Sequence, residues 1–570
     1  MAEEKKMING GDVLIKCLLK ENVKYMFGIP GGQIIHMYDA IYRWGREEGI
    51  NTVMFRHEQA AAHAADAWAR VTNTPGVCFG TVGPGATDLV PGVAAAWSDN
   101  IPVVTIVPQV YLELEDKFTL QGDLDQTAMF KPITKFQKSV REIEKLSDAV
   151  HKAFREATGG RSRPVLLEIW ADVFATEIEE AKISIKPFES YRTINKPAIE
   201  NGLITKTLDL LLNAEKPLIV SGGGVSRAEG WKELQEFAEY LQIPVLTTFM
   251  GAGTISNKSK CLVGTTIVGF GKEVSLNADV ILALGCKFSY TLGFGNEPFW
   301  KDSQQLIQVD IDPSIIGRAK PIRLGIVGDC KIFLNQILEE AKKIAKVDKR
   351  DWLEDLVQRR KMTLDRILKK ASRDKVPILP ERLVKEVFEF MDNDAILVVD
   401  GGDISVQTIE QINLHKPRPP LSTLGAIGMG HLGVAIPYVI GAKLAKPDRQ
   451  VIAIAGDGSF MFNIQDLETA VRLGIKNAII IVANNSAWGM IKSCQKKYLN
   501  KRCIDVDFPD FDYGKCAEGF GCYGESISDP NKIKPTLERA KNSNKIAVIN
   551  VRIDQTMPEG TKLMASMKVL

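Results

Sequence analysis

The sequence lacks the features that mark several broad classes of protein. Its apolar runs fall short of the roughly 18–20 residues that a membrane-spanning helix needs. The polar N-terminus, MAEEKKMING, has no apolar core of a secretion signal. Positive and negative side chains nearly balance, at 72 Lys and Arg against 70 Asp and Glu, so neither nucleic acid nor a membrane surface is indicated as a partner. We therefore expect a cytoplasmic protein that binds neither.

Disulfide, zinc and dehydrogenase patterns are also missing. The nine cysteines are an odd number and include no CxxC pair, which is typical of reduced thiols in the cytosol. The six histidines include no HExxH spacing, which argues against a zinc site. The segment SGGGVS lacks the full GxGxxG spacing that cradles a dinucleotide, which argues against a dehydrogenase.

The length and the linker-like segments predict three domains. The chain has 570 residues, and single domains usually contain about 100–200. Two polar stretches, 183–201 and 346–379, resemble linkers, and the second is densely charged. We therefore expect domains at 1–185, 196–345 and 375–570.

All three parts share one rhythm of short apolar runs and amphipathic helical stretches. The runs end in glycines, acids or amides, as in IPVVTIVPQ, DVILALG, RQVIAIAGDGS and NAIIIVANN. Continuous apolar strands separated by helices are typical of parallel sheets that are covered on both faces. The sequence therefore predicts the α/β class, with three doubly wound parallel-sheet domains.

Two strand ends in the third predicted domain suggest a metal site. The run VIAIA leads into Gly456-Asp457-Gly458-Ser459, and the next run, AIIIVA, leads into Asn484-Asn485. One right-handed crossover brings both strand ends to the same edge of a parallel sheet, so Asp457 and Asn485 can face one site. An acid and an amide oxygen, completed by phosphate oxygens, suit Mg²⁺. The alternative is that GDGS is only a strand-to-helix turn and NN only a loop.

The same segments suit a diphosphate. The glycines allow close approach of backbone N–H groups, and the helix that follows Ser459 favours negative charge at its N-terminus. A third strand end, Gly401-Gly402-Asp403, offers another close backbone approach.

These motifs resemble a known family. The pattern GDGSF…NN resembles the thiamine diphosphate signature of the acetolactate synthase-like superfamily, and the resemblance covers nearly the whole chain. Its other matching segments are GIPGG (Gly28–Gly32), RHEQ (Arg56–Gln59), GPGAT (Gly83–Thr87) and GHLGVAIP (Gly430–Pro437). The resemblance implies a pyrimidine-binding, a central Rossmann-like and a diphosphate-binding domain, with thiamine diphosphate and Mg²⁺ as cofactors.

The resemblance assigns roles residue by residue. Glu58 would protonate the aminopyrimidine ring, although out of context it could be an exposed strand-end glutamate. The Gly430 carbonyl would accept a hydrogen bond from the pyrimidine amino group, and Leu432 would bend the cofactor unless it is simply core packing. Asp457, Asn485 and the backbone oxygen of Ala487 would bind the metal. The other cofactor-binding candidates are Pro30, Gly402, Asp403, Ile404, Gly456, Gly458 and Ser459.

Substrate and nucleotide residues follow from weaker matches. Gly32, Gln33, Gln121 and Trp488 are the remaining catalytic candidates, with His36 nearby, and a structural role is as consistent with each. Segments of the central domain resemble those that hold FAD in acetolactate synthases or ADP in oxalyl-CoA decarboxylases. The candidate nucleotide-binding residues are Arg161, Gly223, Asp310, Ile311, Asp329 and Cys330. The alternative is a central domain that binds no nucleotide.

The reaction is the least determined feature. The first domain resembles acetolactate synthase, whereas the central segment FSYTLGFG (Phe288–Gly295) is more similar to 2-hydroxyacyl-CoA lyases. We favour a lyase that splits a 2-hydroxyacyl-CoA into formyl-CoA and an aldehyde or ketone, or runs the reverse condensation. Acetolactate synthase, which uses 2-oxoacids, and a non-catalytic cofactor-binding homologue stay open. In this superfamily two subunits build each active site together, which implies a homodimer or homotetramer.

Overall fold

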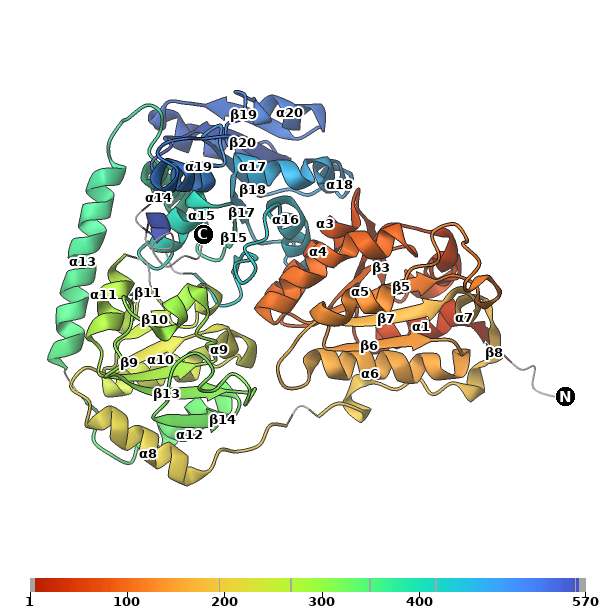
Figure 1. The fold of residues 1–570 in the computed structure, drawn as a ribbon, viewed down its shortest axis with the longest axis horizontal. Helices are drawn as coiled ribbons and strands as arrows, with labels where there is room; N and C mark the ends of the chain where they lie inside the picture. The colour runs from red at the N-terminus through yellow and green to blue at the C-terminus, as the bar shows by residue number, and fades with distance from the viewer. Residues whose placement is uncertain are drawn as a thin grey trace. The chain divides into compact units, whose positions relative to one another are not determined.

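The computed structural model describes residues 6–193, 195–266, 269–347, 350–415, 418–558 and 560–562. Each of the three predicted domains contains one six-stranded sheet of parallel strands flanked by helices (Figure 1). The predicted α/β class is therefore confirmed. Among the described helices, none is both long and apolar enough to cross a membrane.

The first sheet has the strand order β3-β2-β4-β5-β7-β6. Its strands are β2 (Tyr25–Gly28), β3 (Asn51–Met54), β4 (Gly76–Phe79), β5 (Val103–Gln109), β6 (Phe136–Val140) and β7 (Val165–Trp170). The main helices of this region are α1 (Gly10–Lys20), α2 (Ile35–Ala40), α3 (Glu58–Thr72), α4 (Pro84–Asp99), α5 (Gln126–Phe130), α6 (Leu146–Thr158) and α7 (Ala171–Ala175). A separate antiparallel pair joins β1 (Met7–Asn9) to β8 (Glu177–Glu179). The apolar residues of β4, β5 and β7 are buried, as continuous apolar strands predict.

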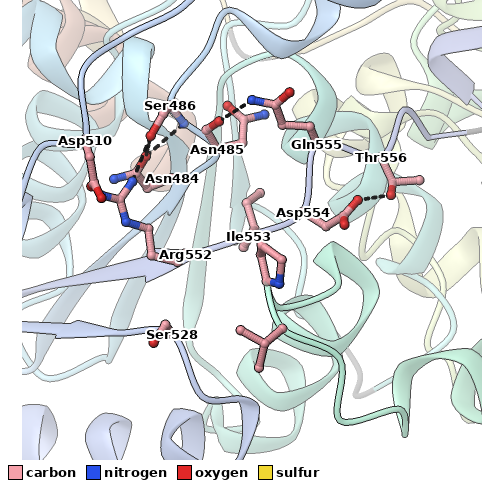
Figure 2. A pocket seen from close by; sticks show the side chains of 12 residues that line it. Asn484, Asn485, Ser486, Asp510, Ser528, Arg552, Ile553, Asp554, Gln555 and Thr556 are labelled. Atoms are coloured by element: carbon pink, nitrogen blue, oxygen red, sulfur yellow. Dashed lines mark hydrogen bonds and ion pairs between the residues drawn. The ribbon is translucent and has the colours of Figure 1, made fainter.

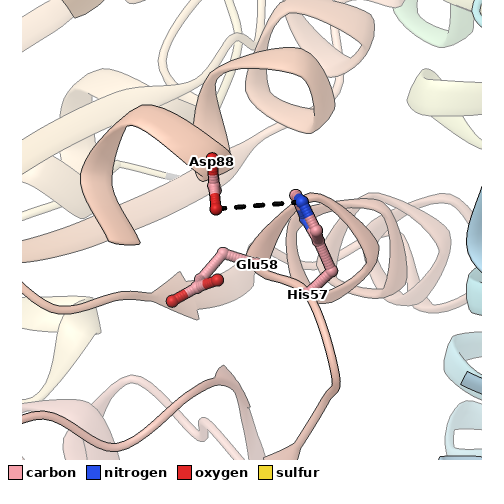
Figure 3. Close-up of side chains that lie close together, drawn as sticks. All are labelled: His57, Glu58 and Asp88. Carbon is pink, nitrogen blue, oxygen red and sulfur yellow. Dashed lines mark ion pairs between the residues drawn. The ribbon is translucent and has the colours of Figure 1, made fainter. Parts of the chain in front are cut away.

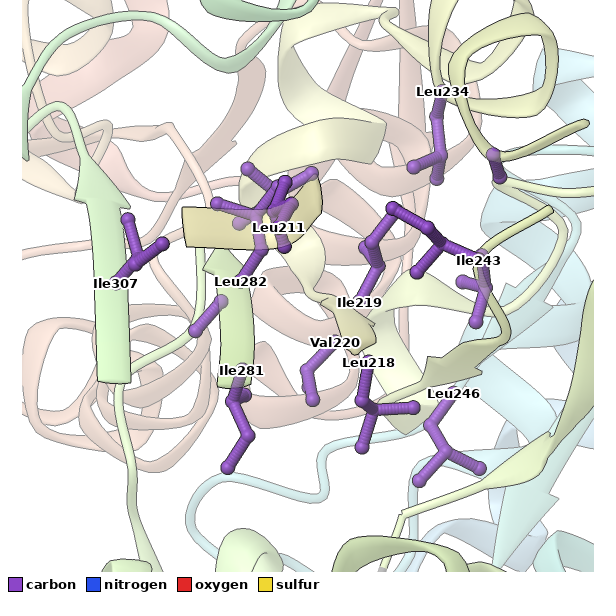
Figure 4. Close-up of a cluster of buried hydrophobic side chains, with 14 of the residues drawn as sticks. Leu211, Leu218, Ile219, Val220, Leu234, Ile243, Leu246, Ile281, Leu282 and Ile307 are labelled. Carbon is purple, nitrogen blue, oxygen red and sulfur yellow. The ribbon is translucent and has the colours of Figure 1, made fainter. Parts of the chain in front are cut away.

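The central sheet has the order β11-β10-β9-β12-β13-β14. Its strands are β9 (Leu218–Ser221), β10 (Val245–Thr247), β11 (Leu262–Thr265), β12 (Val280–Leu284), β13 (Gln305–Asp310) and β14 (Leu324–Val327). The helices are α8 (Asn201–Leu212), α9 (Gly223–Ala228), α10 (Trp231–Leu241), α11 (Phe270–Asn277) and α12 (Cys330–Ala341). Leu218, Ile219, Ile281 and Leu282 belong to its buried core (Figure 4). The charged segment that follows forms α13 (Asp351–Ala371).

The third sheet has the order β16-β15-β17-β18-β20-β19. Its strands are β15 (Ile396–Asp400), β16 (Thr423–Leu424), β17 (Val451–Gly456), β18 (Ala478–Asn484), β19 (Tyr523–Ile527) and β20 (Ile546–Arg552). Its helices are α14 (Pro380–Phe390), α15 (Asp403–Gln411), α16 (Ala435–Ala445), α17 (Asp457–Phe460), α18 (Leu467–Arg472), α19 (Gly489–Tyr498), α20 (Tyr513–Gly519) and α21 (Ile533–Asn542). Pairing of Gly456 with Ala483 places the ends of β17 and β18 side by side. The predicted adjacency of these two strand ends is confirmed.

The described chain divides into two compact units. Residues 6–193, 426–447 and 463–473 form the first, and 195–425, 448–462 and 474–562 form the second. Inside the first unit α3 packs closely on α16, where small residues allow the approach: a Cβ at Gly441 would lie 2.4 Å from the carbonyl oxygen of Ala64. Two segments of the third predicted domain thus group with the first predicted domain. The predicted domain boundaries stay a prediction.

Candidate active site

Glu58 is the first residue of α3, just beyond the end of β3. The preceding His57 caps the helix, because its Nδ1 accepts a hydrogen bond from the backbone N–H of Gln59 at 3.1 Å. Glu58 is only 7% exposed. Burial raises the pKa of its carboxyl, and a hydrogen bond from its own backbone N–H opposes that rise. The environment therefore favours a carboxyl that can hold a proton.

Glycine-rich loops close around this carboxyl. A Cβ at Gly85 would lie 3.0 Å from Glu58 Oε1, so the loop approaches the acid as closely as a side chain allows. Gly83 adopts φ +69°, and a Cβ there would lie 2.4 Å from the carbonyl oxygen of Gln121. Thr81 donates to Gln33 Oε1 at 3.1 Å. The structure therefore brings the loops that carry Gln33 and Gln121 to the end of the sheet where Glu58 lies.

Three other candidates of this region lie at its surface. Pro30 and Gly32 are exposed, and a Cβ at Gly32 would meet no atom within 4 Å. His36 is half-buried on α2. These placements are compatible with contact to a bound molecule, and the roles stay predictions.

Asp88 is a neighbour of Glu58 that the sequence reasoning missed. It lies on α4 with its Oδ2 3.8 Å from His57 Nε2, and one ligand atom from each of His57, Glu58 and Asp88 falls within 4.8 Å of the others (Figure 3). Its negative charge adds to the upward shift of the Glu58 pKa. The signal was its position directly after the matched GPGAT loop.

In the second unit, Asp457 is the first residue of α17 and directly follows β17. It is 3% exposed, and burial raises its pKa to about 6. Its Oδ1 accepts the Gly458 N–H at 2.9 Å. Its Oδ2 is buried without a hydrogen-bond partner among the described residues. Such an oxygen calls for an explanation, and a bound cation satisfies it, so this carboxylate fits the metal role.

The loop after β18 lies against Asp457. Backbone N–H groups of Ser486 and Ala487 partly offset the upward pKa shift of Asp457, so they lie near its carboxylate. Asn485 Oδ1 accepts the Ala487 N–H at 3.2 Å, and the Asn485 carbonyl accepts from Gln555 Nε2 at 2.8 Å. Asp457 and Asn485 therefore lie at neighbouring strand ends, and their oxygens are of the kind that Mg²⁺ prefers.

Two glycines allow close packing around Asp457 and Asn485. The Trp488 ring packs on Gly458, where a Cβ would lie 2.4 Å from the ring. A Cβ at Gly489 would lie 2.6 Å from Asn485 Nδ2 and 3.1 Å from Asp403 Oδ2. Both glycines therefore allow backbone approaches that a larger residue would block.

Asp403 comes from the neighbouring strand end. It begins α15, burial raises its pKa to about 6, and Thr561 donates to its Oδ1 at 2.8 Å. Gly401 adopts φ +113°. A Cβ there would lie 2.9 Å from the Gly456 nitrogen and 3.3 Å from an Ile404 methyl group. Gly402 lies against Met490, and Ser459 is buried. The predicted loops after β15, β17 and β18 therefore meet at one edge.

The remaining cofactor candidates belong to the first unit. Gly430 is exposed and adopts φ +70°, and a Cβ there would meet nothing within 4 Å. Leu432 is half-buried, and its carbonyl lies 2.8 Å from His431 Nδ1. An open backbone turn beside a partly exposed leucine is compatible with the predicted contacts to the cofactor ring.

A cavity of about 670 Å³ adjoins the loop that carries Asn485 in the second unit (Figure 2). Its lining consists of Val376, Pro377, Asn484, Asn485, Ser486, Asp510, Ser528, Arg552, Ile553, Asp554, Gln555 and Thr556. Arg552 pairs with Asp510 and donates to Ser486 Oγ at 2.8 Å. Together with the Gln555 bond, this contact holds the loop from the side of β20.

The nucleotide candidates of the central domain lie at the ends of its strands. Asp310 ends β13, followed by Ile311, and its Oδ1 accepts the Asp312 N–H at 3.0 Å. Asp329 caps α12 through Oδ1, while its Oδ2 pairs with Lys196. A nucleotide that uses Asp329 would have to displace that lysine.

The other nucleotide candidates are mostly engaged in packing or pairing. A Cβ at Gly223 would lie 3.1 Å from Met250 Cβ. Cys330 is buried, and burial raises its pKa well above the usual range. Arg161, in the first unit, donates to Asn100 at 2.8 Å. Nucleotide binding stays a prediction.

Comparison with known proteins agrees with this geometry. Models of the thiamine pyrophosphate enzyme N-terminal TPP binding domain, central domain and C-terminal TPP binding domain match residues 8–129, 204–337 and 400–551. A probable acetolactate synthase large subunit from Methanocaldococcus jannaschii is 34% identical, covering 96% of this chain and 92% of the relative. A glyoxylate carboligase from Escherichia coli O157:H7 is 32% identical, covering 93% and 90%. An acetolactate synthase large subunit from Haemophilus influenzae is 31% identical, covering 97% and 95%.

The match in all three regions, at this identity over nearly full length, establishes the family. The relatives bear the names of acetolactate synthase, one of the two alternatives left open by the sequence, and of glyoxylate carboligase rather than 2-hydroxyacyl-CoA lyase. The chain is therefore a thiamine diphosphate-dependent enzyme of the acetolactate synthase-like superfamily.

Proposed function

We propose that this enzyme is an Mg²⁺-dependent carboligase that decarboxylates a 2-oxoacid and joins the remaining aldehyde unit to a second carbonyl compound. The observation that carries the proposal is the pair of buried carboxyls: Glu58, whose raised pKa suits a proton carrier, and Asp457, whose buried Oδ2 has no hydrogen-bond partner within the described ranges. Bound thiamine diphosphate would supply a nucleophilic carbon that adds to the substrate carbonyl and stabilises the carbanion left by loss of CO₂.

The residues of the second unit would hold the diphosphate end. Asp457, the Asn485 amide oxygen and the Ala487 carbonyl would bind Mg²⁺, and the N–H groups of the Gly456–Ser459 turn would face the phosphate oxygens. The packing of Trp488 on Gly458 fixes the wall of this pocket. Ligands on the ends of neighbouring strands would lose little conformational freedom on binding, which favours tight binding.

Glu58 would exchange a proton with the ring nitrogen of the bound pyrimidine. Its raised pKa suits this task, because proton transfer near neutral pH is most efficient when the pKa of the acid lies near the working pH. Gln33 and Gln121 lie on loops at the same end of the sheet and would orient the substrate carbonyl.

The substrate class rests on the relatives. Their names support 2-oxoacids such as pyruvate and glyoxylate, and therefore move the preference away from the 2-hydroxyacyl-CoA that the sequence favoured. The lyase stays a second candidate because of the segment Phe288–Gly295, whose residues Tyr290–Gly295 form an irregular 3-10 turn with Leu292 and Gly293 buried. A homodimer or homotetramer with shared active sites, and a nucleotide in the central domain, are further parts of the proposal.

The test is a substrate panel on the enzyme with thiamine diphosphate and Mg²⁺. Pyruvate and glyoxylate are supplied singly and together, while CO₂ release and ligated products are measured; formyl-CoA with an aldehyde is the competing arm. CO₂ release with a new C–C bond supports the proposal, and products only in the formyl-CoA arm support the lyase. Cofactor binding without turnover in any arm contradicts both and favours the non-catalytic homologue.

A further inference from the structure

A buried network of charged side chains connects three helices of the first unit. Arg70, on α3, donates from Nε to Asp66 Oδ1 at 2.8 Å and from Nη2 to Asp66 Oδ2 at 3.0 Å. The same Nη2 lies 2.9 Å from Asp99 Oδ2 at the end of α4. The hydroxyl of Tyr438, on α16, donates to Asp66 Oδ2. None of these four side chains is more than 9% exposed.

Stability alone is a poor explanation for this network. Removing charged groups from water costs several kcal/mol per ion, and buried ion pairs often do no better than apolar residues of similar volume. The network also carries one more carboxylate than guanidinium. Its excess negative charge therefore needs further hydrogen-bond donors, and the backbone supplies one of them.

That donor belongs to the turn that carries Gly430 and Leu432. The backbone N–H of Gly428 donates to Asp99 Oδ1 at 2.9 Å. The approach is tight, because a Cβ at Gly428 would lie 2.2 Å from the same oxygen. Two residues later, the Gly430 N–H bonds to the Ala426 carbonyl at 2.9 Å, which closes the turn.

A histidine contact supports the same turn. His63, on α3, is fully buried, and its ring lies 4.7 Å from that of His431, centroid to centroid. Burial, His431 and Arg70 all lower the pKa of His63. The turn therefore rests on α3 through an uncharged ring contact as well as through the charged network.

Helix α3 begins at Glu58, and Asp66 and Arg70 lie further along the same helix. Because a helix rises by a fixed amount of about 1.5 Å per residue, α3 holds Glu58 at a fixed distance from Asp66 and Arg70. We propose that Asp99, anchored by Arg70, is a positioning residue that fixes the Gly428–Leu432 turn relative to Glu58. The Gly430 carbonyl, Leu432 and Glu58 could then contact one pyrimidine ring together. This inference rests on the proposed function.

The test separates the two ends of the cofactor. Asp99→Asn removes the charge that Arg70 holds, and Gly428→Ala pushes the turn away from Asp99. Binding of thiamine diphosphate and of inorganic diphosphate, each with Mg²⁺, is measured by calorimetry on the full-length enzyme. Inorganic diphosphate reports only on the Asp457 and Asn485 end.

Both variants should weaken thiamine diphosphate binding by about 10-fold or more, the loss expected for one charge-assisted hydrogen bond. Binding of inorganic diphosphate should stay within about 2-fold of wild type, since its contacts are untouched. In turnover assays, the cofactor concentration for half-maximal activity should rise more than the maximal rate falls.

Asp12→Asn is the matched control. Asp12 is also a buried acid of the first unit that pairs with an arginine, Arg43, at 2.8 Å and accepts a backbone N–H, that of Asn9, at 3.1 Å. It should leave both affinities at wild-type values. Unchanged thiamine diphosphate affinity in both test variants, or an equal loss for the two ligands, overturns the inference. Wild-type enzyme that binds no thiamine diphosphate overturns the proposed function as well.

Discussion

The two carboxyls at the centre of the proposed site are held in different ways. Glu58 starts a helix of 15 residues, has its own backbone N–H as a hydrogen-bond donor and lies within reach of His57 and Asp88. Asp457 starts a four-residue helix after a buried strand, with one oxygen bonded to Gly458 and the other without a hydrogen-bond partner in the described part of the chain. Burial raises both pKa values. Desolvation therefore favours the protonated form of Glu58, and at Asp457 it would favour binding of a cation to the carboxylate.

Removing the Asp457 carboxylate should have the largest effect. In Asp457→Ala the proposed metal site would lose its acidic side-chain ligand, so Mg²⁺-dependent binding of both thiamine diphosphate and inorganic diphosphate should weaken by roughly 100-fold or more. Calorimetric titration measures both affinities. Asp507→Ala is the control, because this acid of the second unit is exposed and pairs with Lys492. Undiminished diphosphate binding in Asp457→Ala would contradict the metal role.

Glu58→Gln should separate catalysis from binding. The amide keeps the size of the side chain but cannot exchange a proton, so turnover should fall by about 100-fold or more. Thiamine diphosphate affinity should change by no more than about 3-fold, because the diphosphate contacts lie in the other unit. Steady-state kinetics and titration test the two halves of this expectation. A variant with normal turnover would remove Glu58 from the mechanism.

Two glycine substitutions compare the crowding around Asp457 with the crowding around Glu58, which form the two half-sites of the proposed active site. Gly458→Ala would place a Cβ 2.4 Å from the Trp488 ring, whereas Gly85→Ala would place one 3.0 Å from Glu58 Oε1. The first should lower diphosphate affinity by about 10-fold, and the second should slow turnover without that loss, since steric displacement costs about 1–3 kcal/mol. Gly519→Ala is the neutral control, because its Cβ meets nothing within 4 Å. Equal effects of the two substitutions on diphosphate binding would show that the half-sites are not independent.

The smallest expected effect concerns acid stability, which must be known before pH profiles of the half-sites are compared. Burial lowers the pKa of His415 to about 4, whereas an unfolded histidine titrates near about 6.5. Below about pH 6.5 His415 therefore binds a proton in the unfolded chain, whereas in the folded protein it binds one only near about pH 4. As the pH falls through this range, the difference lowers the free energy of unfolding by up to about 1.4 kcal/mol per pH unit.

His415→Phe removes this titration and can keep the ring stacked on Phe388, 5.3 Å away. Urea unfolding at several pH values should show that wild type loses more stability than the variant between about pH 6.5 and about pH 4.5. Parallel losses in the two proteins would mean that other groups dominate acid unfolding.

The strand ends could be predicted from the sequence because they depend on local pattern and on general topology. Apolar runs that end in GDGS and NN, joined by one crossover, had to reach one sheet edge, and the register of Gly456 with Ala483 agrees. Asp403 followed from the same reasoning, since β15 pairs with β17 on the other side. Local patterns of this kind are enough to predict the fold class and the part of the candidate site around Asp457 and Asn485.

The missed features depend on tertiary pairing. Asp66, Arg70 and Asp99 read as ordinary charged residues of two helices, and their burial appears only when α3, α4 and α16 pack together. Asp88 was missed because its neighbour His57 comes from a different loop. Single-sequence patterns also gave no reason for the grouping of 426–447 with the first unit.

The hydrogen bond from Gln555 to the Asn485 carbonyl connects the loop after β18 to the chain that leaves β20. A second tie, from the Ile553 N–H to the Asn484 carbonyl at 2.9 Å, lies beside it. The segment that follows Arg552 is therefore linked by two hydrogen bonds to the loop that carries Asn485. A protease cut in it should become slower once Mg²⁺ and diphosphate are bound, which offers a measure of site occupancy that needs no knowledge of the substrate.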